Sequence, residues 1–437
     1  MPKCTKESIQ YPAFDRRVIE SEFSGGNITS DGGVLLLREV DRLTKLTESV
    51  AAALEDPRRP KSCRHDLLSL IRQRVYAIGC GYEDLNDHNA LRGDIAMQTA
   101  VNRDTELAGS STLCRFENRA DRMTALRIHE VIVDRFIASF KRAPKELILD
   151  FDATDDRVHG NQEGRFFHGY YDDYCFLPLY VFCQDQLLVS YLRPSRIDGA
   201  KHAWAILALL VKRLRRAFPG VRIIFRGDSG FCRFRMLSWC ERHDVKYIVG
   251  IAQNNRLNAR IEGLMEKAKR DHSQDGGKIR RFTQFQYAAG SWDHPRRIIA
   301  KIEVNAFGPN PRYVVTNLEG TPKRLYERVY CARGDMENRI KQQQLDLFAD
   351  RTSCHKWWAN QFRLLLSSLA CMRRESIRRL ALKGTELAHA YAGTIRLKLF
   401  KIGAVLLRNT RRIRFLLSSS YPYQNLFRSV AKKLAPG

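Results

Sequence analysis

The sequence predicts an α/β protein in which helices cover the faces of a sheet, with a helical region before the sheet and another after it. Three observations support this class. In residues 144–254, short apolar runs alternate with longer amphipathic segments, which is typical of helices packed on a sheet. In residues 255–328, strand-like runs follow one another. Residues 1–143 and 353–437 instead show the three-to-four-residue apolar spacing of helices.

The N-terminal region contains three predicted helices. The letters "TSD" at residues 29–31 supply candidate caps for the apolar run that follows. The segment "HDLLSLIRQRVYAIGCGYEDL" places apolar residues on one helical face and then stops at Gly79 and Gly81. A third amphipathic helix is predicted over "RMTALRIHEVIVDRFIASF". We therefore expect residues 1–143 to form one mainly helical domain.

The central region is predicted to run in the order strand, hairpin, helix, strand, helix, strand. In chain order these elements are "ELILDFDAT", "PLYVFCQDQLLVSYLRP", "AWAILALLVKRLRRAF", "VRIIFRGDSGF", "CRFRMLSWCERHD" and "KYIVGIA". Residues 255–328 then break the alternation with three strand-like runs, "RRFTQFQYAAGSW", "RRIIAKIEVNAF" and "RYVVTNLEG". We interpret this stretch as a β-rich insertion into the sheet region. Helical periodicity resumes near Pro322 and predicts a helix within residues 329–352.

The charge of the chain predicts a polyanionic partner. Lysine and arginine number 74 and the acids 48, which gives a net charge of +26. Nucleic acid is the first candidate, and a generally basic surface is the alternative. The excess is uneven, because residues 355–437 hold seventeen lysines and arginines and only two acids. Regular apolar residues there predict basic helices that pack, rather than a disordered arm.

The cysteines and the apolar runs narrow the cellular setting. Eleven cysteines are scattered along the chain without a Cys-x-x-Cys pair, which argues against a zinc finger. The first residues, "MPKCTKESIQY", lack the apolar core of a secretory signal. No apolar run approaches the length of a membrane span. We therefore expect a cytoplasmic protein with no membrane partner.

Acidic residues mark the ends of two predicted strands and one predicted helix. Asp150 and Asp152 are two residues apart on the first strand, so their side chains share one face. Asp228 follows a later strand, and α/β sheets carry their chemistry at such ends. Glu337 falls on the helix after the sheet. Three converging carboxylates suit hard divalent cations such as Mg²⁺, although Asp at a strand end is also common as a turn or cap residue.

These blocks together resemble a known family. The element order and the segments "LDFDATDDRVHGNQEG", "FRGDSGF" and "YCARGDMENRIK" are similar to the ribonuclease H-like core of bacterial insertion-sequence DDE transposases, DDE group-one type. More narrowly, the chain resembles insertion-sequence family thirteen-eighty, related to the YREK-bearing superfamily. "GYEDLNDHNALRGD", "STLCRFEN" and "NQFRLLLSSLA" fit the same family, so the resemblance covers nearly the whole chain.

The resemblance implies a catalytic trio. The Asp-x-Thr pattern makes Asp152 the first position in preference to Asp150, and Asp228 and Glu337 are the second and third. These three would be the metal ligands, and we expect their carboxylates to lie within metal-bridging reach of one another. The cofactor would be Mg²⁺, with Mn²⁺ able to substitute and with two ions per site. Two ions can activate the attacking water and stabilise the leaving oxygen.

The family signature around the glutamate is incomplete here. Tyr330, Arg333 and Glu337 match it, whereas the signature lysine position holds Gln344. On a regular helix, these residues and Lys341 all lie within about 40° of the glutamate. That stripe predicts an acid flanked by phosphate-binding groups. We expect Lys341 to take over the phosphate contact of the missing lysine.

The β-rich insertion adds three further predicted DNA contacts. Trp292 lies close to Arg296 and Arg297 in a stretch that the sheet itself does not need. An aromatic ring near an active site can stack on a base extruded from the duplex. The alternative is that Trp292 packs in the small core of the insertion.

The resemblance implies a cut-and-paste DNA transposase. It would cleave terminal inverted repeats, transfer the strand into target DNA and work as a homodimer on double-stranded DNA in a bacterial cytoplasm. Residues 1–143 would be its DNA-binding domain, and residues 144–254 and 329–352 would form the ribonuclease H-like core around the insertion, followed by basic helices in residues 353–437. The alternatives are a metal-dependent nuclease of the same fold without strand transfer, and an inactive, domesticated DNA-binding protein.

Overall fold

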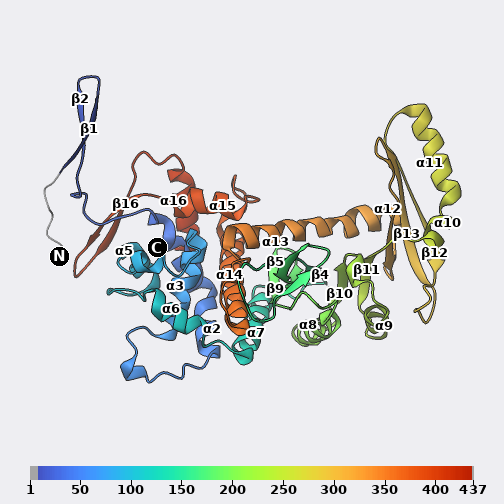
Figure 1. Ribbon diagram of the computed structural model, residues 1–437, viewed down its shortest axis with the longest axis horizontal. Coiled ribbons are helices and arrows are strands. Elements are labelled where there is room, and N and C mark those ends of the chain that lie inside the picture. Colours follow the sequence, from blue (N-terminus) through green and yellow to red (C-terminus); the bar gives the residue numbers. More distant parts are fainter. Residues whose placement is uncertain (1–7, 436–437) are drawn as a thin grey trace. The chain divides into compact units, whose positions relative to one another are not determined.

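The computed structural model describes residues 8–435 and divides into two compact units (Figure 1). The first contains the chain up to Arg119, residues 346–348 and everything from Leu369 onward. The second contains Ala120–Leu345 and Ala349–Ser368. This division places residues 120–143 in the second unit, whereas the sequence predicts that they end the N-terminal domain. The predicted lack of a secretory signal rests mainly on residues 1–7, which lie outside the described residues.

The first unit is mainly helical. Asp66 caps the helix over the second predicted segment by accepting a hydrogen bond from the Ser69 amide, and Gly81 ends that helix in a left-handed conformation. The unit combines an N-terminal and a C-terminal segment of the chain, and a buried ion pair between Asp41 and Arg373 links the two. Its elements are β1 (Ile9–Phe14), β2 (Arg17–Ser21), β3 (Ile28–Thr29), α1 (Leu35–Thr44), α2 (Leu46–Ala53), α3 (Leu67–Cys80), α4 (His88–Leu91), α5 (Ile95–Val101), α6 (Ser110–Glu117), α15 (Ala392–Ile395), β16 (Ala404–Arg408), β17 (Ile413–Leu417) and α16 (Gln424–Leu434).

The C-terminal part of this unit differs from the all-helical expectation. Strands β16 and β17 pair as an antiparallel hairpin, and β16 also pairs with β3. The physical reason is the turn between them, where the amides of Arg411 and Arg412 donate to the Asn409 side chain. An asparagine that bonds the backbone two and three residues ahead favours a turn over a continuing helix.

A nine-stranded sheet organises the second unit. Its order is β12-β13-β15-β11-β10-β4-β8-β9, and β14 (Gly308–Pro309) pairs with β13. Strands β4, β10 and β11 are mutually parallel. On one side β8 pairs antiparallel with β4, and β9 pairs antiparallel with β8. On the other side β11, β15, β13 and β12 follow in that order, and each neighbouring pair is antiparallel. The bounds are β4 (Glu146–Ala153), β8 (Leu179–Cys183), β9 (Gln186–Tyr191), β10 (Arg222–Gly227), β11 (Lys246–Ile251), β12 (Ile279–Tyr287), β13 (Arg296–Asn305) and β15 (Arg312–Thr316).

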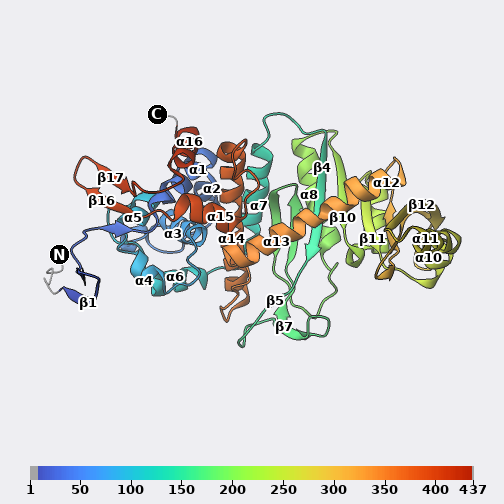
Figure 2. The same cartoon turned by 90° about the horizontal axis from the view of Figure 1, so that it is seen from above.

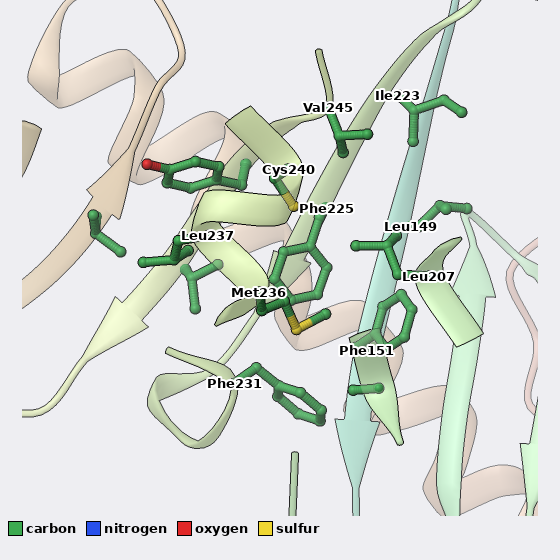
Figure 3. Close-up of a cluster of buried hydrophobic side chains, with 14 of the residues drawn as sticks. Leu149, Phe151, Leu207, Ile223, Phe225, Phe231, Met236, Leu237, Cys240 and Val245 are labelled. Carbon is green, nitrogen blue, oxygen red and sulfur yellow. The ribbon is translucent and has the colours of Figure 1, made fainter. Parts of the chain in front are cut away.

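Helices cover both faces of this sheet. Strand residues such as Phe151 and Phe225 point to one face, where they pack with α7 (Arg122–Ala138), α8 (Ala203–Ala217) and α9 (Phe234–Arg242). Figure 3 shows these two rings beside Phe231, and the ring pairs meet edge to face. Because α7 contributes Val133 and Phe136 to this core, it belongs to the second unit rather than the first.

The opposite face carries the helical segment that follows the insertion. It begins with α12 (Pro322–Arg324), passes through a π-helical segment at 325–330 and a 3-10 turn at 331–333, and continues as α13 (Gly334–Leu347). Met336 and Ile340 of α13 pack on Tyr180 and Phe182 of β8. Figures 1 and 2 show α13 running along the sheet, on the side opposite α8 and α9. The first half of α14 (Trp357–Ile377) packs here as well.

The insertion extends the sheet beyond β11. Its strands β12, β13 and β15 occur where the sequence predicts strands, and helices α10 (Asn255–Ala259) and α11 (Glu262–Asp275) precede them. Elsewhere in the second unit, β5 (Asp156–Arg157), β6 (Phe166–His168) and β7 (Asp173–Phe176) form a small separate sheet. Within residues 8–435, the helices are all too short or too polar to cross a bilayer.

Candidate active site

Asp152 and Asp228 lie at the carboxyl ends of two neighbouring parallel strands. Asp152 is the last acid of β4, and Asp228 directly follows β10, in a register that pairs Phe151 with Gly227. Because side chains alternate along a strand, Asp152 faces the same side of the sheet as α13. Glu337 lies in the first turn of that helix. The three predicted catalytic acids therefore gather at one edge of the sheet.

One guanidinium joins two of these acids. Arg333 donates from Nη1 to Asp152 Oδ2 at 3.1 Å and from Nη2 to Glu337 Oε1 at 2.5 Å. Asp152 is largely buried, with 13% of its side chain exposed, whereas 57% of the Glu337 side chain is exposed. Arg333 is half-buried in line with its bridging position. The structure thus brings together the predicted acid, cation and glutamate.

The acids also influence one another electrically. The pKa of Asp152 is raised to about 6, mainly by burial. The positive charge of Arg333 opposes this increase, and the negative charges of Asp228 and Glu337 add to it. A carboxyl among other carboxylates resists ionisation, and a nearby cation relieves that cost. Arg333 supplies part of this compensation.

The carboxylates do not form a closed metal site in this arrangement. Among residues 8–435, no three His, Cys, Asp or Glu side chains are placed so that they could hold an ion. In this arrangement the Arg333 guanidinium contacts both Asp152 and Glu337, and metal binding by the three acids stays a prediction. The donor set itself fits a hard divalent cation, since it consists of carboxylate oxygens whose mutual repulsion a cation would offset.

Asp228 has a structural task as well. Its Oδ1 accepts the Gly230 amide at 2.9 Å and so caps the short 3-10 helix at residues 229–231. Asp228 therefore acts as the turn or cap residue that the sequence offered as an alternative to a metal ligand. Oδ2 makes no hydrogen bond to any described residue, which leaves one carboxylate oxygen available for another partner.

Asp150 is committed to a buried ion pair that sequence reasoning did not identify. Arg226 on β10 donates from Nη2 to Asp150 Oδ2 at 2.7 Å, and its Nε contacts the other carboxylate oxygen. The same guanidinium donates from Nη1 to the carbonyl oxygen of Val329, just before the signature tyrosine. Two strands and the segment leading to Glu337 are thus held by one side chain. The only sequence signal for this ion pair is an arginine within a predicted apolar strand, two residues before Asp228.

Tyr330 reaches the turn that carries Asp228. A Cβ built on Gly250 of β11 would lie 2.6 Å from the Tyr330 hydroxyl oxygen and 2.9 Å from the Ser229 amide nitrogen. Only glycine leaves room for this approach. Burial raises the pKa of Tyr330, and the negative charge of Asp228 adds to the increase, whereas Arg333 lowers it. The hydroxyl therefore stays protonated at neutral pH and can donate a hydrogen bond.

The two positions that concern the missing lysine behave differently. Gln344 donates from Nε2 to the Asp155 carbonyl oxygen at 2.9 Å, three residues beyond Asp152. It therefore ties α13 to the loop after β4. Lys341 is exposed and forms no ion pair with any residue in 8–435, and Glu337 pairs with Arg333 instead. The π-helical and 3-10 turns before α13 also mean that Tyr330 and Arg333 do not follow the regular helical stripe predicted from the sequence.

The three predicted DNA contacts of the insertion lie in packing networks. Arg296 is 3% exposed and pairs with Glu241 and Asp293 at 2.7 and 3.0 Å. Trp292 is half-buried and meets Tyr287 edge to face, with ring centroids 5.8 Å apart.

Arg297 also serves the fold. It donates from Nη1 to the Leu318 carbonyl oxygen at 2.6 Å and from Nη2 to that of Gly320 at 2.7 Å. None of these insertion side chains contacts the three acids in the described residues. A DNA contact by either arginine would require these bonds to open.

Comparison with known proteins places this geometry in a family. No curated protein sequence matches the chain. Among solved structures, one match is a piggyBac transposase synaptic complex with hairpin DNA, with 11% identity, a TM-score of 0.44, and coverage of 85% of this chain and 80% of that one. The family model described as "Transposase DDE domain group 1" matches residues 11–436. Since that match spans nearly the whole sequence, from β1 to the end of α16, the chain belongs to the group 1 DDE transposases.

Proposed function

We propose that the protein is a cut-and-paste transposase that cleaves DNA at the terminal inverted repeats of its own element and transfers the freed strand into target DNA. The observation that carries this proposal is the convergence of Asp152 and Glu337 on one arginine, beside Asp228. These residues are far apart in the sequence and meet at the carboxyl ends of two strands. The family to which the chain belongs is one of transposases.

The sheet supports a ribonuclease H-like core. The strands β9, β8, β4, β10 and β11 lie in that order, and only β8 runs antiparallel to the other four. In this proposal, residues 144–254 form the core, residues 255–328 are an insertion, and residues 329–352 return to add the catalytic helix. The narrower assignment to insertion-sequence family thirteen-eighty rests on the sequence motifs.

Asp152, Asp228 and Glu337 are the proposed ligands of divalent metal, with Mg²⁺ as the natural ion, Mn²⁺ as a substitute and two ions per site. Such ions activate the attacking oxygen and stabilise the leaving oxygen of a phosphodiester. The free Oδ2 of Asp228 and the exposed carboxylate of Glu337 are the oxygens open to this role. The largely buried position of Asp152 keeps its carboxylate out of bulk water, which strengthens its interaction with a cation.

The cations around these acids are the proposed phosphate ligands. Arg333 has a planar guanidinium that suits the bidentate binding of phosphate. Lys341 projects from the exposed side of α13 one turn beyond Glu337 and has no acid partner among the described residues. The Tyr330 hydroxyl can donate to a phosphate oxygen beside the Asp228 turn.

The first unit is the proposed platform for the DNA ends. It contains residues 8–119 together with the basic stretch from Leu369 onward, so the predicted N-terminal DNA-binding domain and the basic C-terminal region form one body. Transposition brings two ends together, and a homodimer on double-stranded DNA is the simplest assembly that provides two active sites.

The test compares Asp152→Asn, Asp228→Asn and Glu337→Gln with the wild type. Each variant should lose cleavage of an end-containing duplex in Mg²⁺ or Mn²⁺, by a factor of about 10³ or more, because one ligand of the ion is gone. Binding to the same duplex should remain within about two-fold. Asp150→Asn in the buried pair is the wrong-site control, since it should reduce stability before it reduces the intrinsic rate.

A donor duplex mixed with a supercoiled target separates the function from its relatives. Joined donor–target product supports transposition. Cleavage without joining would indicate a nuclease, and binding without cleavage in either metal would indicate an inactive DNA-binding protein. A normal cleavage rate for Asp228→Asn would show that the trio has been assigned wrongly.

A further inference from the structure

The β16–β17 hairpin has one face that holds it to the first unit. Strand residues Ala404 and Leu406 on that face are buried. Arg408 at the end of β16 donates from Nη1 to the Gln98 side-chain oxygen at 2.9 Å and to the Asp104 carbonyl oxygen at 3.1 Å. The hairpin also extends a sheet with β3. It is therefore a supported ribbon rather than a free loop.

The other face of the ribbon is uncovered within the described residues. The cross-strand pairs Val405–Leu416 and Leu407–Arg414 form it. Val405, Leu416 and Leu407 are 36%, 42% and 47% exposed. A small apolar strip thus runs along a two-stranded ribbon and ends in an arginine.

The tip of the ribbon and the adjoining part of β17 carry cations without counter-ions. Arg411 and Arg412 in the turn and Arg414 on β17 are exposed, and none of their side chains has an ion pair or hydrogen bond to any residue in 8–435. No acid follows Glu386 anywhere in the chain. The turn itself is well formed, since the Asn409 amide donates to the Arg412 carbonyl oxygen at 3.0 Å. The three charges therefore project from a fixed frame.

The shape and the charge fit one partner. The major groove of duplex DNA admits a two-stranded β-ribbon, and its walls are lines of phosphate. Apolar side chains on the ribbon face can contact thymine methyl groups in that groove. The excess of arginine and the lack of acids in this segment favour a polyanion over a neutral protein surface. Exposed arginines beside that face supply the positive charge that phosphate contacts require.

We propose that the β16–β17 ribbon docks in the major groove of the DNA, with the Val405, Leu407 and Leu416 face toward the base edges and Arg411, Arg412 and Arg414 on the phosphates. This inference deepens the proposed function, on which it rests for the identity of the partner. It assigns a DNA-binding element to a segment far in the sequence from the acids proposed to be catalytic.

The first experiment measures the salt dependence of binding. Arg411→Ala/Arg412→Ala is compared with Arg59→Ala/Lys61→Ala, a pair in the same unit that is also exposed and without an ion pair to any described residue. Both doubles are made in an Asp228→Asn background, so that cleavage does not interfere. The probe is a mixed-sequence duplex of about 40 base pairs, titrated by fluorescence anisotropy between about 50 and 200 mM salt.

The ribbon double should lower the slope of log K against log[salt] by about 2, because each phosphate contact contributes about 0.9. The control double should change it by less than about 1. Alanine keeps the backbone amides that bond Asn409, so the turn is retained. Equal changes in the two doubles would overturn the proposal, as would an altered oligomeric state with unchanged DNA binding.

The second experiment identifies the groove. Dimethyl sulfate methylates guanine N7 in the major groove and adenine N3 in the minor groove. Bound protein should protect N7, and Arg411→Ala/Arg412→Ala/Arg414→Ala should lose that protection at a subset of guanines. Netropsin, a minor-groove ligand, should not displace the protein.

Protection of adenine N3 alone, or displacement by netropsin, would overturn major-groove docking. Both experiments measure binding without cleavage. If the catalytic variants behave unexpectedly while the ribbon variants behave as stated, the assignment of the acids fails and that of the ribbon stands. If the catalytic variants behave as stated but the ribbon double changes the salt slope no more than the control double does, only the ribbon inference fails.

Discussion

Removing the positive charge of Arg226 tests how α13, the proposed catalytic helix, is held in place. Arg226 is 6% exposed and Asp150 only 1%, so Arg226→Met leaves a carboxylate buried without its partner. Breaking a buried pair in this way costs about 3–5 kcal/mol. The double variant Asp150→Leu/Arg226→Met replaces both charges by apolar groups. It should lose only about 1–3 kcal/mol, the cost of the Val329 carbonyl left unpaired.

The cleavage rate should not recover with stability in the double variant. The hydrogen bond from Arg226 to Val329 fixes the chain just before Tyr330, Arg333 and Glu337. A charge-assisted bond contributes about 1.5–3 kcal/mol. If that energy holds the catalytic geometry, cleavage by the double variant should fall by a factor of about 10–150.

Urea unfolding and single-turnover cleavage are the two assays. All five tryptophans lie in the second unit, so their fluorescence follows the unfolding of the sheet that contains the pair. Arg222→Met is the matched control on the same two strands. It breaks the exposed pair with Glu146, N–O 3.5 Å, and should cost less than about 1 kcal/mol. A wild-type urea midpoint for Arg226→Met, or wild-type cleavage by the double variant, would refute this reasoning.

Four further predictions concern single positions. Because the folded pKa of Asp152 is raised to about 6, the metal-free protein should lose about 3 kcal/mol of stability as the pH rises from about 4 to 6, since the unfolded carboxyl ionises first. Asp152→Asn should remove this loss, measured by urea midpoints in chelator, and an unchanged pH profile would count against the raised pKa. Gly250→Ala should displace the Tyr330 hydroxyl and slow cleavage about 10-fold or more at unchanged DNA affinity, which would not occur if the turn simply relaxed. If the Trp292 ring stacks on an extruded base, a contact of about 1–3 kcal/mol, Trp292→Ala should slow cleavage of intact duplex more than cleavage of an end with an unpaired base. Equal slowing on both substrates, together with a lowered melting temperature of the protein, would indicate that the ring packs within the fold. Lys341→Ala should weaken binding to cleaved ends and lower the salt slope by about 1, and Gln344→Lys should partly restore binding; no effect of the first change would show that another cation serves the site.

The sequence alone determined the local structure of the sheet region. Strands β4, β10 and β11 and the β8–β9 hairpin occur where short apolar runs predict them, and the helices between them follow the amphipathic segments. Such patterns are local, because a side chain's direction repeats every two residues in a strand and every three to four in a helix. The placement of Asp152 and Asp228 at strand ends followed from the same pattern. The family was likewise readable, because its motifs are short and contiguous, and the match to residues 11–436 confirms it.

The tertiary structure decided which partner each polar side chain takes. The strand pattern puts Asp150 and Asp152 on one face, two residues apart, and only the neighbouring strand shows that Arg226 engages Asp150. Burial of Arg296 and the bridging position of Arg333 depend on chain segments more than fifty residues away. The hairpin at 404–417 also formed against β3, nearly four hundred residues earlier in the chain. Charge balance and burial are properties of the packed molecule, because a side chain's neighbours in space are set by the whole fold and not by its neighbours in sequence.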